Sequence, residues 1–189
     1  MHELLFQYFQ EKTKISPTQF QDICPFFEPK LVKKKEFLLM EQEVCRYIFF
    51  VNRGCLQLYS VDEAGQELTR YLAFERKFAT ALTSFIQQAP SFEYIQAAVD
   101  TELLRVTYEN FYHLVDTNPA VRFVYRGILE NAYITSQERI YNFLGKTALE
   151  KLHWLLESQP DIFNRLPSQV IASYLGMTPY TLSRLKADL

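Results

Sequence analysis

The segment from Leu166 to Leu185 constrains the fold of this chain more than any other part of its sequence. Its residues LPSQVIASYLGMTPYTLSRL have the pattern of two short helices joined by a tight turn. Ala172 is small where a second helix must cross closely, Gly176 stands where the chain turns with positive φ, and Pro179 suits the first turn of the second helix. The segment therefore predicts a helix-turn-helix of the DNA-binding kind.

The outward side chains of this motif are of the types that contact DNA. The candidate DNA-binding residues are Ser168, Gln169, Thr178, Tyr180, Thr181, Ser183, Arg184 and Lys186. Arg184 suits the edge of a guanine, while Thr181 and Ser183 suit either a base or a phosphate. The alternative is a pair of helices inside an ordinary helical subdomain. DNA binding is favoured because several features of the segment agree: the small residue, the glycine, the cap, the proline and the leucines that face inward.

The charge of the chain limits this prediction to a local site. The whole chain of 189 residues has a net charge of −2, so it is not the strongly basic protein that non-specific nucleic-acid binding favours. From Gly145 onward, five basic residues face four acidic ones, a net charge of +1. A second hypothesis therefore stays open, in which the motif serves protein contact in a sensor or dimeric scaffold. An enzyme ranks third, because the sequence has no Gly-rich phosphate loop, Gly-x-Ser-x-Gly or His-Glu-x-x-His motif.

The first half of the chain has the pattern of a hairpin-built β domain behind short helices. Ser16 and Pro17 suit the cap and first residue of an N-terminal helix. Asn52-Arg53-Gly54 and Asp62-Glu63-Ala64-Gly65 suit tight turns. The predicted strands are 37–40, 47–51, 56–59 and 68–72, with a second β portion over 94–106.

A long helix follows the β segment. The residues that recur along it in steps of four and three are Val121, Tyr125, Ile128, Ala132 and Thr135. This spacing predicts the seam of a homodimer, or, equally, a stripe that packs on its own domain. Gly145 interrupts the helical pattern. The predicted division is a sensor domain over 1–116, a dimerisation helix over 117–144 and a helix-turn-helix domain over 145–189.

These features together resemble the Crp/Fnr family of bacterial transcription regulators over nearly the whole chain. The resemblance implies an α+β fold with a double-stranded, jelly-roll-like β-roll as sensor, a long dimerisation helix and a winged-helix-type helix-turn-helix. It implies that Arg184 reads the operator and that Gln169 and Thr178 contact phosphates. Pro179-Tyr180 departs from the Arg-Glu pair of the best-known members, so their operator sequence does not carry over. The implied partners are an operator in double-stranded DNA, a second copy of the chain and RNA polymerase.

The sensor segment departs from the family pattern for cyclic nucleotides. The family holds the phosphate with a Gly-Glu pair and, about ten residues on, an Arg followed by Ser or Thr, because a buried anion needs a guanidinium partner. Thr80 and Ala81 replace the pair here, and Ser91 stands at the position of the arginine. The degenerate pocket comprises Phe78, Thr80, Ala81, Leu82, Thr83, Ser91 and Phe92. The sequence thus argues against cyclic AMP, and we expect aromatic side chains to fill the nucleotide space.

No other cofactor is indicated by the sequence. Three cysteines, at 24, 45 and 55, are too few and too scattered for an iron–sulfur cluster, and the three histidines lack metal-ligand spacing. We read no signal peptide and no membrane anchor. The expectation is a cytoplasmic regulator with reduced thiols, with room for an unidentified small-molecule effector.

Overall fold

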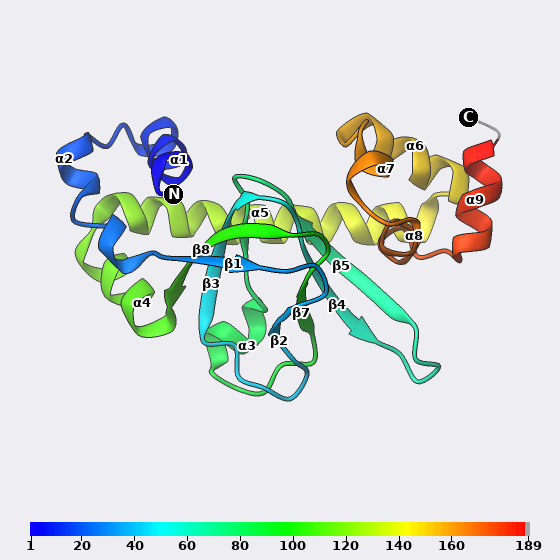
Figure 1. The fold of residues 1–189 in the computed structure, drawn as a ribbon, viewed down its shortest axis with the longest axis horizontal. Coiled ribbons are helices and arrows are strands. Elements are labelled where there is room, and N and C mark those ends of the chain that lie inside the picture. Colours follow the sequence, from blue (N-terminus) through cyan, green and yellow to red (C-terminus); the bar gives the residue numbers. More distant parts are fainter. Residues whose placement is uncertain (188–189) are drawn as a thin grey trace.

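The computed structural model describes residues 1–187, and its centre is a β-roll of two antiparallel sheets (Figure 1). The strand order is β1-β8-β3-β6 in one sheet and β2-β7-β4-β5 in the other. The strands are β1 (Glu28–Val32), β2 (Phe37–Leu39), β3 (Tyr47–Arg53), β4 (Leu56–Val61), β5 (Glu67–Ala73), β6 (Phe78–Ala79), β7 (Tyr94–Ala97) and β8 (Thr101–Thr107). The predicted α+β class with an N-terminal β-roll is confirmed.

Helices cluster at both ends of the molecule, and the longest, α5, runs from the β-roll to the C-terminal helices (Figure 1). The helices are α1 (Glu3–Thr13), α2 (Pro17–Phe20), the 3-10 helix η1 (Cys24–Phe26), α3 (Leu82–Gln87), α4 (Tyr108–Thr117), α5 (Pro119–Gly145), α6 (Ala148–Ser158), α7 (Ile162–Arg165), α8 (Ser168–Leu175) and α9 (Pro179–Ala187). With 27 residues, α5 is about 40 Å long. Within residues 1–187, no helix has the length and apolar character needed to cross a membrane.

Short polar side chains start three of the helices, and the first of them, Ser16, was predicted from the sequence. The Ser16 hydroxyl accepts the backbone N–H of Gln19, and Pro17 is the first residue of α2. Asn118 caps α5 in the same way, and Thr147 forms a reciprocal capping box at the start of α6. These contacts satisfy backbone N–H groups that have no partner inside the helix.

Two elements have no clear signal in the sequence. Strand β1 contains Pro29, but it pairs on only one side, with β8. An edge strand tolerates a proline because one row of its N–H groups faces away from the ladder. Helix α3 has six residues, which is too short for a helical period to stand out.

The first apolar core lies inside the β-roll and under the N-terminal helices. In β3, residues 48 to 51 are all buried, without the alternation expected of a strand with one wet face. The reason is that β3 is covered on both sides: Tyr8 of α1 packs on Phe50, with ring centroids 5.7 Å apart, while other β3 side chains join the inter-sheet core.

The C-terminal helices share a second core with the β-roll. Leu152, Ile171 and Leu182 pack in one cluster with Cys55 and Leu72 of the roll. Helix α8 also lies against β5. There, the Ser173 hydroxyl accepts the Thr69 N–H at 3.0 Å and donates to the Glu67 carbonyl at 2.6 Å. The helix-turn-helix is therefore docked on the sensor domain of its own chain.

Gly54 occupies the predicted turn between β3 and β4 with φ at 103°. A Cβ atom at this position would lie 2.6 Å from the Thr101 hydroxyl and 2.7 Å from the Asp100 carbonyl. Both the backbone conformation and the close approach of β8 therefore require glycine.

We expect Gly54→Ala to lower the free energy of unfolding by about 1–3 kcal/mol, because it combines a strained φ with a steric clash. Gly65→Ala is the matched control, since Gly65 has φ at 78° with nothing within 4 Å of the added Cβ. Urea unfolding followed by circular dichroism measures both. Equal losses in the two variants would contradict the role of the Thr101 contact.

Candidate nucleic-acid interface and sensor site

The turn of the helix-turn-helix has the geometry that its sequence predicts. Gly176 ends α8 with φ at 64°, and its N–H donates to the carbonyls of Ala172 and Ser173. The Thr178 hydroxyl accepts the Thr181 N–H at 3.1 Å. Ala172 and Leu182 are fully buried between the helices. A Cβ at 176 would lie 2.5 Å from the Phe143 ring, so this glycine also lets the turn pack against the end of α5.

Helix α9 presents a polar face to solvent. Tyr180 is 72% exposed, and Ser183 and Arg184 lie beside it on the exposed side of the helix. Arg184 forms no ion pair with any residue of the described range 1–187. Its guanidinium is free to meet a base edge or a phosphate. By contrast, the Lys186 ammonium lies 4.4 Å from the centre of the Phe163 ring.

Two further candidate residues lie at the N-terminus of α8. Ser168 and Gln169 are exposed in its first turn. The first N–H groups of a helix carry a partial positive charge that attracts phosphates. Thr181 is half-buried by its contact with Thr178, at 2.9 Å between the two hydroxyls, so it is less available than Ser183.

The residues of the degenerate pocket do not converge on one cavity. Phe92 is 58% exposed, and Thr83 also faces solvent. Ala81 is buried, whereas Phe78, Thr80 and Leu82 line a different cavity farther along the sheet. Phe85 of α3 is buried among Tyr108, Phe111 and Tyr112 of α4, whereas Phe92 is exposed.

An internal ion pair lies next to the position of the missing cassette arginine. The Ser91 hydroxyl donates to the Glu93 carbonyl at 2.9 Å and accepts the Glu93 N–H at 3.0 Å. The buried Glu93 carboxylate is held by two nitrogens of Arg70, one of them at 3.0 Å. A carboxylate with its own guanidinium partner leaves no cation here for a cyclic phosphodiester.

The stripe of α5 predicted as a dimer seam packs on its own domain. Val121 is 0% exposed within its own chain, and Tyr125 and Ile128 pack against the core of the β-roll. Ala132 and Thr135 line a cavity beside β5. Within the single chain, the first three of these side chains pack on the β-roll and the last two line the cavity, and the prediction of a dimer seam along this stripe stays a prediction.

The opposite face of α5 is apolar and exposed. Its large exposed hydrophobic residues are Phe123, Tyr133, Ile134, Ile140, Tyr141 and Leu144. This face was not predicted from the sequence, although the sequence contains a signal for it: residues 133 and 140, like 134 and 141, are seven residues apart, which is the heptad spacing of paired helices. An apolar surface of this kind on a long helix marks an interaction site.

No cluster of three or more His, Cys, Asp or Glu side chains with metal-binding geometry occurs among residues 1–187. Cys45 and Cys55 are buried, and no disulfide links the three cysteines. Burial also raises the pKa of the Cys55 thiol, which disfavours the reactive thiolate form.

Comparison with known proteins assigns the central part of the chain. Residues 29–118 match the family of the cyclic nucleotide-binding domain. Among curated proteins, none matches this chain. FixK2 from Bradyrhizobium japonicum has the same fold at 18% identity and a TM-score of 0.75, with 86% of this chain and 84% of that chain covered. A CooA variant from Carboxydothermus hydrogenoformans matches at 21% identity and a TM-score of 0.71, with 95% of this chain and 81% of that chain covered. A regulator described as a member of the Crp/Fnr family from Eubacterium rectale matches at 20% identity and a TM-score of 0.72, with 95% of this chain and 85% of that chain covered.

The chain combines a β-roll, a long connecting helix and a C-terminal helix-turn-helix, and an architecture of this kind does not by itself fix a function. More specifically, residues 29–118 match the cyclic nucleotide-binding domain family, and the chain as a whole shares its fold with the FixK2, CooA and Eubacterium rectale structures.

We expect calorimetric titrations with cyclic AMP and cyclic GMP at micromolar concentrations to be flat. The reason is that Ala81 and Ser91 supply neither a carboxylate nor a guanidinium, and Arg70 is already paired with Glu93. A regulator that carries the full cassette, titrated in the same buffer, is the positive control. A micromolar isotherm for this chain would contradict the alignment of the cassette.

Proposed function

We propose that this protein is a dimeric DNA-binding transcription regulator of the Crp/Fnr type, acting in the cytoplasm, and that its sensor domain does not respond to cyclic AMP. The observation that carries the proposal is the exposed polar face of α9. This face places Tyr180, Ser183 and Arg184 on solvent while Leu182 anchors the helix from behind. Recognition helices of this class insert such a face into the major groove. The proposal includes contact with RNA polymerase at promoters, and no catalytic role.

Selection from random duplex DNA provides the operator on which the recognition helix is tested. We expect Arg184→Ala to weaken binding by about 1–3 kcal/mol per half-site and to relax the preference at one base pair. Gln169→Ala should weaken binding to all sequences about equally, because a phosphate contact carries no sequence information. Both residues are exposed, so the variants should fold normally.

The matched control is Lys34→Ala, an exposed basic residue on the turn after β1, which should leave operator affinity unchanged. Binding should also weaken as salt rises, as counterion release requires. Unchanged affinity of Arg184→Ala would transfer support to the second hypothesis, in which the motif contacts protein. The low charge of the C-terminal region favours that second hypothesis.

The dimer in this proposal forms through the exposed face of α5. Two copies paired there would bury the aromatic and aliphatic side chains that one copy leaves in water. Leu144 is 83% exposed in the single chain. A leucine this exposed within an apolar patch is expected to be covered by a partner. Pairing of long helices along such a stripe would place the two α9 helices on one side of the dimer, as half-sites about 34 Å apart require.

We expect Ile134→Glu to convert the dimer into a monomer at micromolar concentration, because two carboxylates would face each other at the centre of the interface. Ile134 is 52% exposed in the single chain, so its substitution should not disturb the monomer fold. Leu31→Glu is the matched control, since Leu31 is an exposed aliphatic residue, at 68%, on the edge strand β1. Light scattering reports the mass. A wild-type monomer, or a dimer that survives Ile134→Glu, would contradict this interface.

A further inference from the structure

A buried chain of hydrogen bonds joins the first helix of the helix-turn-helix to strands β4 and β5 of the β-roll. The Gln57 amide donates to the Thr69 hydroxyl at 2.8 Å, and the hydroxyls of Thr69 and Ser173 lie 2.6 Å apart. Ser173 in turn donates to the Glu67 carbonyl at 2.6 Å. Gln57 and Thr69 are 2% and 1% exposed, so water does not replace these bonds when one of them is lost.

The donors and acceptors of this chain fit together in one direction. The single hydroxyl proton of Ser173 goes to the Glu67 carbonyl, so the Thr69 hydroxyl donates to Ser173. The Thr69 backbone N–H also donates to the Ser173 oxygen, at 3.0 Å. Removal of the Ser173 hydroxyl would therefore leave two buried donors of Thr69 without an acceptor. We refer to Gln57, Glu67, Thr69 and Ser173 as the β5 junction.

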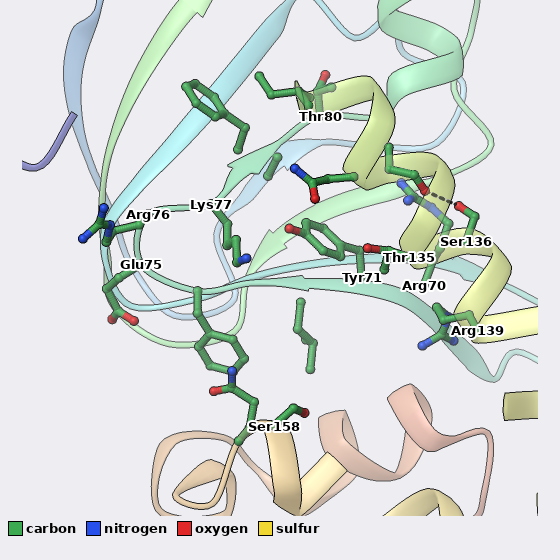
Figure 2. Close-up of a pocket in the computed structure, with 18 of the residues that line it drawn as sticks. Arg70, Tyr71, Glu75, Arg76, Lys77, Thr80, Thr135, Ser136, Arg139 and Ser158 are labelled. Carbon is green, nitrogen blue, oxygen red and sulfur yellow. Dashed lines mark hydrogen bonds between the residues drawn. The ribbon is translucent and has the colours of Figure 1, made fainter. Parts of the chain in front are cut away.

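The β5 junction uses the free edge of its sheet. Strand β5 is the last strand in the order β2-β7-β4-β5, and the outer N–H and C=O groups of an edge strand have no neighbouring strand to pair with. At Thr69 both groups are bonded by helices instead: Ser173 of α8 accepts the N–H, and Arg139 of α5 donates to the carbonyl at 2.9 Å. Figure 2 shows Arg139 beyond Thr135 and Ser136 along α5, on the side of the C-terminal helices.

A second polar contact lies just past the other end of β5. Arg165, at the end of α7, donates to both carboxylate oxygens of Glu75, at 2.7 and 2.6 Å. Its guanidinium also lies 4.4 Å from the centre of the Phe74 ring, and Glu75 accepts the Gly54 N–H at 2.8 Å. Strand β5 has seven residues and is roughly 20 Å long, so most of this length separates the contact at Glu75 from that at Thr69.

Two contacts separated along one strand fix an orientation, whereas a single contact allows rotation about itself. Between them, Leu72 packs in the apolar core that it shares with Ile171 and Leu182. Apolar packing is not directional, but hydrogen bonds require defined distances and angles, so the polar contacts select one arrangement of the helix-turn-helix on the roll. Arg184 stays exposed in this arrangement, which is therefore compatible with contact to DNA.

The β5 junction is separate from the cavity of about 550 Å³ between β5, α5 and α6 (Figure 2). We call it the basic cavity, because its charged lining residues are Lys12, Arg70, Arg76, Lys77, Arg139 and Arg165, against the carboxylate of Glu75. Gln57, Thr69 and Ser173 are not among its lining residues in the described range 1–187. Substitutions at Thr69 and Ser173 therefore change the orientation contacts and leave the cavity wall intact.

We infer that the β5 junction, together with the ion pair of Arg165 and Glu75, sets the orientation of the helix-turn-helix on the β-roll, and that Thr69 and Ser173 are positioning residues for operator binding. The second part rests on the proposed function. In a dimer, a fixed orientation holds the two α9 helices at one separation, so an operator of matching spacing is bound without a further cost for ordering the two motifs. A looser junction binds each half-site as before and loses part of the gain from joining two half-sites.

Hydrogen exchange measured by NMR tests the orientation contacts without DNA. Ser173→Ala should speed exchange of the Thr69 amide about tenfold, because this N–H loses its acceptor. The Leu58 amide is the internal control, since Leu58 lies in the central strand β4 and pairs with both β5 and β7. Alanine is a good helix former, so α8 should remain folded. Equal exchange of the Thr69 amide in the wild type and the variant would overturn the inference.

Operator spacing tests the positioning role. Two base pairs inserted between the selected half-sites rotate one half-site against the other by about a fifth of a helical turn. This insertion should cost the wild type about a hundredfold in affinity, and Thr69→Val or Ser173→Ala about tenfold or less, while all three bind a single half-site equally. Thr69→Ser keeps the hydroxyl and should behave as the wild type. Thr117→Val is the matched control, because it removes an exposed hydroxyl that is bonded within α4.

The half-site measurement separates positioning from a merely structural role. If affinity for a single half-site falls as far as affinity for the full operator, the substitutions damage the helix-turn-helix itself. If the spacing penalty is unchanged, the junction does not set the separation of the two motifs. Either result would overturn the positioning role. Failure of the wild type to bind any operator contradicts the proposed function instead, and hydrogen exchange then decides whether the junction orients the helices.

Discussion

The packing of α5 on the β-roll is the contact on which the rest of the structure depends. Val121 and Val124 are buried against the roll near the start of the helix, and the same rigid helix reaches Gly176 of the helix-turn-helix through Phe143 near its end. A continuous helix of 27 residues fixes the position of one end relative to the other, because its backbone hydrogen bonds lie within the helix and keep it rigid. Each face of α5 consequently has a separate role: one face closes the sensor domain and lines the basic cavity, and the other is apolar and exposed.

Docking of α8 on β5 ties the helix-turn-helix to the β-roll without covering the exposed face of α9. The bonds of Ser173 to Thr69 and Glu67 use the side of α8 that faces the roll, whereas Arg184 on α9 stays in solvent. These polar bonds lie beside the apolar core that the C-terminal helices share with Leu72 of the roll. Such an interface is able to shift when a ligand favours one arrangement.

The β-roll matches the fold of the cyclic nucleotide-binding domain, whereas its residues depart from the cassette pattern. At the cassette, Glu93 and Arg70 neutralise each other, so the position that would hold a cyclic phosphate has no free cation. Unpaired positive charge appears instead on Lys77 and Arg139, which the fold brings together from a turn and a distant helix. A recognisable fold therefore does not specify the ligand, because ligand choice depends on a few side chains at the site.

The sequence by itself determined the elements that rest on local physics. Turn chemistry at Gly54 and Gly176, the cap at Ser16 and the strand pattern predicted a hairpin-built β domain and the helix-turn-helix, because φ preferences and caps act within a few residues; the β-roll was expected only from the family resemblance. Tertiary structure alone decided which face of α5 is buried. A four-three stripe such as that of Val121 has the same spacing whether it meets its own domain or another chain. The cavity around Arg139 was likewise invisible to the sequence, because its lining residues are far apart along the chain and only the packing of three elements brings their charges together.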